Sequence, residues 1–380
     1  MAYDIAVAGL GGMGSAILAH CASRGASAIG FDRLGPVNTL GSSSGKSRMI
    51  RKAYFEDPAY VPLLLRAYEL WRKLERETNE GLLCITGLLM VGEESSEIIE
   101  GSRRAANQHN LLIESLSKRQ IKARYPTLKV LDEEVGVFEP EGGVLSPERA
   151  VHAHLGMAAV AGAHMRFGVA MESWNAIDEG FEIRLTDGTH VSARVLILAL
   201  GPWFQEILES LGVPIRVQRN IQAWFSPATD AYDAPDFPGF LLDRRGFPAP
   251  LYGFPDFGDG VKAAFHGLGD LTDAEHIDRD VDLSRDVEPI TRALEQWMPG
   301  AAKMLRSAKP CMYTLTPDGH FVIDHHPDHK NLILCGGFSG HGFKFAPAVG
   351  EIAADLALDG GSRHNIEFLS HRRFLSGNRM

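Results

Sequence analysis

The chain has little cysteine and no long hydrophobic run. It holds four cysteines in 380 residues, and no two of them form a CxxC pair, so the sequence indicates neither a disulfide framework nor a zinc site. The longest apolar candidate, Val195–Leu200, stops at Gly201-Pro202, far short of the roughly 18 residues that a membrane-spanning helix needs. We therefore expect four single thiols and no membrane span. The first residues also lack the basic segment of a signal peptide, which predicts a cytoplasmic protein.

Positive charge is also in short supply. The 38 lysines and arginines are outnumbered by 48 acids, giving a net charge of −10, and the basic residues are dispersed among the acids. A nucleic-acid partner is therefore disfavoured, because such proteins carry a basic stripe or patch. The apolar fraction of 45% is ordinary for a globular protein, and the length is enough for two domains. The sequence does not indicate an oligomeric state, and we favour a monomer.

The N-terminal segment has the pattern of a strand, a glycine turn, a helix, a second strand and an acid. A short apolar strand at 3–8 runs into Gly9-Leu10-Gly11-Gly12-Met13-Gly14, and a second strand ends at Asp32. Gly9 permits the tight turn, Gly11 lets the backbone approach a pyrophosphate, and Gly14 allows the helix to pack closely on the strand. The helix N-terminus can then bind the phosphates, and Asp32 is placed to bind a ribose. This predicts a dinucleotide-binding unit, without separating FAD from NAD.

Later segments predict how this unit is extended. Apolar runs at 195–200 and 332–335 each end in a glycine turn, which favours buried strands of one parallel sheet. Residues 58–80 have the apolar spacing of an amphipathic helix. The stretch 222–270 is rich in proline, glycine and aromatic residues, and its short strand-like pieces suit an antiparallel sheet. We therefore expect a second, β-rich domain inserted into the first.

A glycine-rich run near the C-terminus is a second candidate site. Gly337-Phe338-Ser339-Gly340-His341-Gly342-Phe343-Lys344 lies between a predicted strand and an apolar helix at 346–358. Its free N–H groups at a helix N-terminus would attract negative charge, such as the charge of a reduced flavin ring. An ordinary glycine-rich turn with a surface lysine is the alternative interpretation.

Taken together, these segments resemble the monomeric sarcosine oxidase and N-methyltryptophan oxidase family, which are FAD-dependent amine oxidases. The resemblance runs nearly end to end. The motifs that carry it are Gly9–Gly14, Asp32, Gly45-Lys46-Ser47-Arg48-Met49-Ile50-Arg51, Arg51-Lys52-Ala53-Tyr54, Tyr60-Val61-Pro62-Leu63, Tyr252-Gly253-Phe254-Pro255, Cys311-Met312-Tyr313, Gly340-His341-Gly342-Phe343-Lys344 and Gly350-Glu351.

The resemblance implies an α/β fold of the hydroxybenzoate-hydroxylase-like type, in which the flavin lies between two domains. A discontinuous FAD-binding domain with a Rossmann-like βαβ unit is expected at residues 1–85, 145–219 and 320–380. An inserted β-rich substrate domain is expected at 86–144 and 220–319.

The resemblance also implies which residues hold the cofactor. The flavin is expected to be joined covalently to the thiol of Cys311. The other implied FAD-binding residues are Gly9, Gly11, Gly14, Asp32, Ser42, Arg48, Gly340, Gly342 and Lys344. The cysteines Cys21, Cys84 and Cys335 are expected to be ordinary thiols.

The remaining implied roles concern substrate and oxygen. Arg51 and Lys344 would hold the substrate carboxylate, one as a planar fork and the other as a point charge. Tyr252 and Tyr313 would border the substrate. The implied catalytic residues are Arg48, Lys262, whose positive charge would assist the reaction of reduced flavin with oxygen, and His266, which would handle protons. Lys262 and His266 would share one face of a strand.

The activity that follows is oxidation of a C–N bond of a small secondary amino acid to an imine, which water hydrolyses, while O2 becomes H2O2. Where the family typically has a His-His pair this chain has Ser43-Ser44, and Leu251 stands where the family often has a tyrosine. Because both differences lie around the substrate cavity, N-methyl, cyclic and glycated amino acids all stay candidates. A dehydrogenase with another electron acceptor, a non-catalytic flavin scaffold and an NAD-dependent enzyme are the alternatives. The histidines at 325–329 are interpreted as a polar turn, and no metal is expected.

Overall fold

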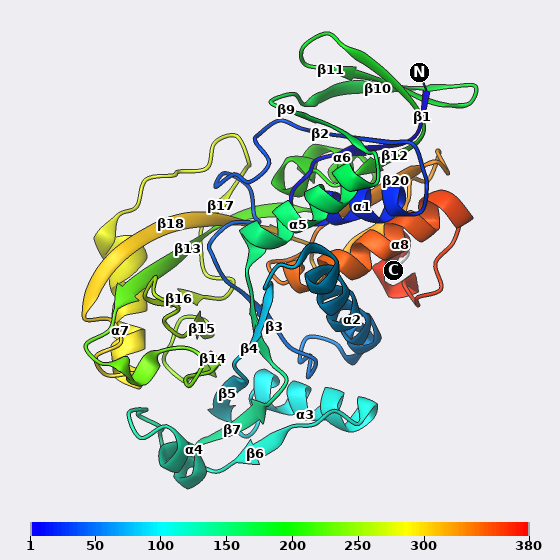
Figure 1. The fold of residues 1–380 in the computed structure, drawn as a ribbon. Coiled ribbons are helices and arrows are strands. Elements are labelled where there is room, and N and C mark those ends of the chain that lie inside the picture. Colours follow the sequence, from blue (N-terminus) through cyan, green and yellow to red (C-terminus); the bar gives the residue numbers. More distant parts are fainter. Residues whose placement is uncertain (1, 379–380) are drawn as a thin grey trace.

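The computed structural model describes residues 2–378, and their elements form two large sheets with helices packed around them (Figure 1). The first sheet has the order β10-β11-β12-β1-β2-β9, with β20 beside β12 and β19 beside β20. These strands are β1 (Ala2–Ala8), β2 (Ala28–Asp32), β9 (His164–Phe167), β10 (Met171–Ile177), β11 (Gly180–Leu185), β12 (His190–Leu198), β19 (Val322–His325) and β20 (Leu332–Gly336).

The centre of this sheet is parallel, as the buried apolar runs predict. β1 pairs in parallel with β2 and β12, and β12 pairs in parallel with β20. One face is covered by α1 (Gly12–Ser23), which packs against α5 (Pro147–Val160) and α8 (Ala346–Asp359). The side chains of Ile17, Ile197 and Val349 meet in one buried cluster there. Burial on both faces explains why these strands are almost wholly apolar.

The second large sheet has the order β17-β13-β16-β15-β14-β5-β7-β6, and β18 pairs with β13. Its strands are β5 (Leu88–Glu93), β6 (Glu114–Leu116), β7 (Glu134–Glu139), β13 (Arg216–Ser226), β14 (Gly239–Asp243), β15 (Leu251–Phe254), β16 (Val261–Phe265), β17 (Leu271–Thr272) and β18 (Met304–Leu315). Every pair is antiparallel except β14 with β5. The predicted antiparallel middle of the chain is therefore confirmed.

Smaller elements connect the two sheets. A short sheet with the order β3-β8-β4 joins β3 (Arg48–Ile50), β8 (Gly143–Leu145) and β4 (Leu83–Ile85). The predicted amphipathic helix is α2 (Val61–Thr78), which follows the short helix η1 (Pro58–Tyr60). The other helices are α3 (Glu97–His109), α4 (Lys118–Arg124), η2 (Gly201–Phe204), α6 (Gln205–Ser210), η3 (Asp230–Tyr232), η4 (Leu283–Val287), α7 (Glu288–Trp297), η5 (Phe343–Phe345), η6 (Glu367–Leu369) and η7 (His371–Asn378).

The α/β prediction with an N-terminal βαβ unit is confirmed by this arrangement. We keep the two-domain division as a proposal: the first sheet takes its strands from residues 2–32, 164–198 and 322–336, and the second from 88–139 and 216–315. Between residues 2 and 378, none of the helices has the length and apolar character needed to cross a membrane.

Candidate active site

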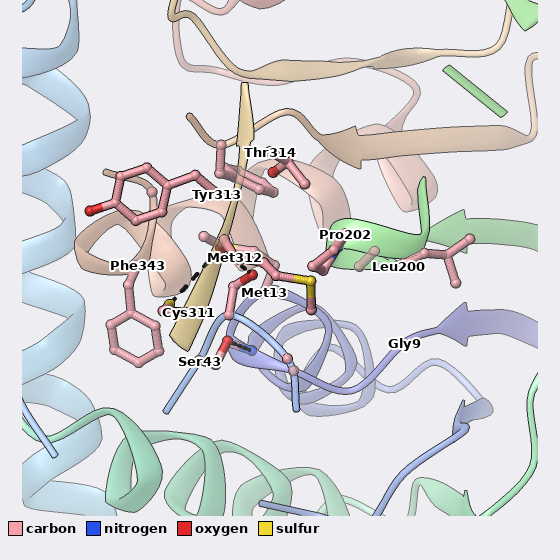
Figure 2. Close-up of a pocket in the computed structure, with 18 of the residues that line it drawn as sticks. Gly9, Met13, Ser43, Leu200, Pro202, Cys311, Met312, Tyr313, Thr314 and Phe343 are labelled. Carbon is pink, nitrogen blue, oxygen red and sulfur yellow. Dashed lines mark hydrogen bonds between the residues drawn. The ribbon is translucent and has the colours of Figure 1, made fainter. Parts of the chain in front are cut away.

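A long cavity runs between the two large sheets and is lined by both. Phe31 and Asp32 come from the first sheet, whereas Gln222, Leu241 and Tyr252 come from the second. Figure 2 shows that Gly9 and Met13, at the start of α1, and Cys311 and Tyr313, on β18, border the same space. The cavity therefore joins the two glycine-rich runs that the sequence singled out.

Glycine is required at one end of the cavity by close backbone packing. Gly9 has a φ of +88°, and a Cβ at this position would lie 2.4 Å from the carbonyl oxygen of Ala199. A Cβ at Gly14 would lie 1.7 Å from the carbonyl oxygen of Gly9. Gly11 caps α1 without a side-chain hydrogen bond, while the Gly12 N–H donates to Ser43 Oγ over 2.9 Å. Ser43 therefore takes one N–H group of the helix N-terminus, and the turn that leads into this helix lines the cavity, where a phosphate could approach it.

Asp32 lies at the carboxyl end of β2, beside this turn. Its two carboxylate oxygens accept hydrogen bonds from the backbone N–H groups of Leu10 and Leu34, and each bond is 2.7 Å long. These bonds fix the carboxylate at the cavity wall and leave lone pairs for a ribose hydroxyl.

The C-terminal glycines that line the cavity pack against aromatic rings. Gly340 has a φ of +80°, and a Cβ there would lie 2.3 Å from the ring of Tyr313; at Gly342 it would lie 2.6 Å from Phe338. The chain then turns into η5 and α8. The ammonium of Lys344, on η5, donates to the His341 carbonyl oxygen over 2.7 Å. Burial, and next the charge of Arg51, lower the pKa of Lys344 to about 7.

Arg51 is buried in the cavity wall with its charge already paired. Its Nη2 lies 2.6 Å from each carboxylate oxygen of Glu56, and its guanidinium packs 4.4 Å from the ring centres of Tyr54 and Phe55. Its Nε–H is buried without a partner. Burial would raise the pKa of Glu56, but Arg51, His341 and Lys344 outweigh it and lower that pKa to about 2. A carboxylate can therefore be bound at this position, and Glu56 is the one bound now.

Two tyrosines and a histidine form the wall between these cations and β18. Tyr313 Oη and His266 Nδ1 lie 3.4 Å apart and share a hydrogen bond, and the Tyr252 and His266 rings meet edge to face at 6.2 Å. Burial is the main cause that lowers the pKa of His266. The imidazole is therefore neutral near pH 7 and can accept a proton.

Lys262 and Arg48 bind the loop at 42–47. The Lys262 ammonium donates to the carbonyl oxygens of Gly45 (2.8 Å) and Ser47 (3.0 Å), and burial, followed by Arg48, lowers its pKa well below the usual value. Arg48 lines the cavity and donates to the carbonyl oxygens of Ser47 and Ser42, each over 2.9 Å. Ser42 Oγ donates to the Met312 carbonyl oxygen over 2.8 Å. Lys262 is not itself among the lining residues, unlike His266.

The four cysteines lie in different surroundings. Cys311 is buried on β18 and lines the cavity, and its side chain is drawn there in Figure 2. Cys21 and Cys335 are buried in the core of the first sheet, while Cys84 is exposed on β4. Cys311 is thus the cysteine that a group in the cavity can reach.

Three residues at or beside the site are absent from the sequence-based prediction: Glu56, Gln222 and Lys309. Glu56 and Gln222 line the cavity, and Lys309 lies on β18 beside it. The spacing of two between Lys309 and Cys311 is the one signal that could have found any of them, because alternate residues of a strand share a face. Within residues 2–378, the structure contains no group of three or more metal-ligating side chains.

The cavity fits FAD on the evidence of its own residues. The N-terminus of α1, which lines the cavity, suits a pyrophosphate, and Asp32 suits a ribose. Gln222 lines the cavity and its buried Oε1 has no hydrogen-bond donor in the protein, so it is free to accept from a bound group. Cys311 lies farther along the same cavity.

Comparisons of sequence agree with this fit. A family model described as FAD dependent oxidoreductase, DAO, matches residues 4–356. A monomeric sarcosine oxidase of Streptomyces avermitilis is 40% identical over 378 residues, which cover 98% of this chain and 97% of that protein. An N-methyl-L-tryptophan oxidase of Yersinia pestis is 32% identical over 375 residues, which cover 98% of this chain and 100% of the relative.

Comparisons of structure give the same fold. NikD, described as an unusual amino acid oxidase essential for nikkomycin biosynthesis, superposes with a TM-score of 0.87 at 24% identity, with 97% of both chains covered. An L-proline dehydrogenase from P. horikoshii gives 0.85 at 20% identity, with 99% of this chain and 98% of that chain covered. Because the family model that matches residues 4–356 is that of FAD dependent oxidoreductases, the cofactor is FAD rather than NAD. This chain belongs to the FAD dependent oxidoreductase family and, within it, to the monomeric sarcosine oxidases and N-methyltryptophan oxidases, and it is a flavin-dependent amine oxidase.

Proposed function

We propose that this enzyme oxidises the C–N bond of a small secondary amino acid, either N-methylated or cyclic, to an imine that water then hydrolyses. The observation that carries this proposal is the pair of buried basic side chains, Arg51 and Lys344, which line the same cavity as the aromatic side chains Tyr252 and Tyr313. Such a pair selects a carboxylate over a plain amine. The names of the relatives, sarcosine oxidase and N-methyl-L-tryptophan oxidase, support the same substrate class.

Arg51 and Lys344 would hold the substrate carboxylate. Because the Glu56 carboxylate is hydrogen-bonded to Arg51 in the free protein, the substrate carboxylate must displace Glu56 from Arg51. Tyr252 and Tyr313 would pack beside the substrate and keep water out. His266, whose lowered pKa favours the neutral imidazole, would accept a hydrogen bond from the substrate amine, and the amine would react in its neutral form.

FAD, when bound, supplies the two-electron acceptor and returns the electrons to oxygen, releasing H2O2. We propose that the Cys311 thiol is joined to it, and that Ser42, Arg48, Gly340 and Gly342 help to hold it. Lys262 lies against the 42–47 loop and would provide positive charge for the oxygen reaction. The chain would act as a monomer in the cytoplasm, where four free thiols are ordinary.

The test is a panel of secondary amino acids. N-methyl, cyclic and glycated amino acids, and amines without a carboxylate, are mixed with the purified enzyme without oxygen, and bleaching of the yellow flavin is recorded. Oxygen is then admitted and peroxide is measured. We expect N-methyl or cyclic amino acids to bleach the flavin fastest and to yield one peroxide per turnover. Fast bleaching without peroxide would identify a dehydrogenase, and bleaching best by glycated amino acids would overturn the substrate class.

A further inference from the structure

Lys309 and Cys311 lie on the same side of strand β18. They are two residues apart, and alternate residues of a strand face the same side of a sheet. Their partners on β13 are Gln222, opposite Lys309, and Asn220, opposite Cys311. Directly opposed residues of antiparallel strands also share a face. Lys309 therefore shares its face of β18 with Cys311 and, across the strand pair, with Gln222, both of which line the cavity; Lys309 itself is not a lining residue.

The Lys309 ammonium is held near the cavity without a carboxylate in contact. Its Nζ lies 3.4 Å from Ser44 Oγ and 5.7 Å from the ring centre of Trp224. None of the ion pairs found within residues 2–378 includes Lys309, and Ser44 Oγ accepts the hydrogen bond that its ammonium donates. The side chain is partly buried, so its charge is only partly screened by water.

The charged groups around Lys309 come from several elements. They are Glu148 on α5, Arg48 on β3, Lys46 in the preceding loop, Lys262 on β16 and Cys311 itself. Glu148 accepts from the backbone N–H groups of Gly45 and Lys46, and the Lys46 ammonium is paired with Asp259. Burial, Arg48 and Lys46 together lower the pKa of Lys309, although Glu148 and Cys311 act in the opposite direction. Because Lys309 and Cys311 stand two positions apart on one strand face, opposite charges on their side chains would attract each other.

This mutual effect matters because the thiolate, rather than the thiol, is the nucleophilic form of cysteine. A lysine nearby raises the thiolate fraction at neutral pH. Lys262 also interacts with Cys311, but its ammonium is directed to the carbonyl oxygens of Gly45 and Ser47. Lys309 is the cation that shares both strand and face with the thiol.

We propose that Lys309, anchored by Ser44, is a positioning residue for covalent attachment of the flavin, because it holds Cys311 as a thiolate. This inference rests on the covalent FAD proposed above. The Cys311 sulfur forms a bond to the 8α carbon of the flavin as that carbon loses a proton, and the electron pair goes into the ring. The product is two-electron-reduced FAD joined by a thioether, and O2 then takes two electrons and two protons to give H2O2.

The experiment measures linked flavin as a fraction of bound flavin. The full-length unmodified, Lys309→Gln, Lys309→Arg, Ser44→Ala and Lys303→Gln proteins are purified with FAD. Flavin absorbance gives the total, and flavin fluorescence on the denatured polypeptide gives the linked part. Lys303 is an exposed lysine just before β18 and serves as the matched control. Samples of each protein are also incubated with FAD in air from pH 6 to pH 9, and bond formation is followed over time.

We expect the unmodified protein, Lys303→Gln and Lys309→Arg to be linked as purified. Lys309→Gln should bind FAD but link it at least tenfold more slowly at pH 7. Its linking rate should rise about tenfold per pH unit up to the ordinary thiol pKa of about 8.5, as the thiolate fraction does. Ser44→Ala should slow linking by a smaller factor.

Two outcomes would overturn the inference alone: complete linking of FAD in Lys309→Gln at pH 7, or a slow rate that does not respond to pH. If Lys309→Gln binds no FAD, the Ser44→Ala and Lys309→Arg variants test the inference instead. An unchanged linking rate in Ser44→Ala, together with no linking of bound FAD in Lys309→Arg, would show that the charge of Lys309 plays no part. Unlinked flavin in the unmodified protein would instead reject the covalent bond itself, and the inference with it.

Discussion

Glu56 occupies the guanidinium of Arg51, with both of its carboxylate oxygens 2.6 Å from Nη2. The guanidinium that we propose to bind the substrate carboxylate is thus already paired with a carboxylate of the protein. Glu56→Gln removes the charge of this competitor, so the substrate should bind more tightly. We expect KM for the best amino acid to fall by about tenfold, equivalent to about 1.4 kcal/mol.

The same variant leaves Arg51 buried without a counter-charge, which is costly in a protein interior. The melting temperature of Glu56→Gln should therefore fall in the absence of ligand and recover when a carboxylate ligand is added. An unchanged KM together with an unchanged melting temperature would show that Glu56 does not compete with substrate.

Replacing Arg51 tests the substrate class directly. Arg51→Met removes a charge-assisted pair, and its loss should cost about 2–5 kcal/mol in transition-state binding. That corresponds to a fall in kcat/KM of roughly 30-fold to several-thousand-fold. Arg51→Lys should recover only part, because a point charge cannot reproduce the planar fork. Amines without a carboxylate should lose little, and an Arg51→Met enzyme that still handles its best amino acid normally would exclude the amino-acid assignment.

The lowered pKa of Lys344 predicts how binding depends on pH. Because its pKa in the free protein is about 7, the side chain is charged below pH 7 and neutral above it. The affinity for a simple carboxylate inhibitor should therefore weaken as pH rises through about 7, by at most tenfold per unit. Inhibition constants measured from pH 6 to pH 9 test this. In Lys344→Met the inhibitor should bind weakly with no inflection near pH 7; an inflection kept there would assign it to another group.

Covalent attachment through Cys311 predicts that denatured protein keeps its flavin. Acid precipitation of the unmodified enzyme should leave the yellow colour in the pellet, and Cys311→Ala should release it. Cys84→Ala is the matched control, because Cys84 is an exposed thiol away from the cavity. Flavin found wholly in the supernatant of the unmodified enzyme would reject the bond.

Lys262 should matter for oxygen more than for the amine. Its charge is needed only after the flavin holds electrons, so Lys262→Met should slow reoxidation far more than reduction by substrate. Stopped-flow measurement of the two half-reactions separates them. Equal slowing of both would point instead to the hydrogen bonds with Gly45 and Ser47, which Lys262 makes in the folded protein.

The parts of the site that the sequence predicted are those with a local pattern. The turn at Gly9–Gly14 and the turn before Lys344 each stand between a strand and a helix, and strand and helix periodicities are visible in a sequence. Glu56 could not be predicted in the same way, because it lies in an irregular segment where spacing does not fix side-chain direction. The role of Lys309 depends on its strand partner Gln222, which is 87 positions away and is known only once the strands pair.

The packing of Gly340 on Tyr313 determines where this enzyme can be redesigned. Any side chain at Gly340 would collide with the tyrosine ring, so Gly340 cannot change while Tyr313 keeps its ring. Leu241 and Tyr252 also line the cavity, and they lie opposite each other on β14 and β15. Paired substitution of these two could reshape the space for bulkier amines while the glycine turns stay as they are.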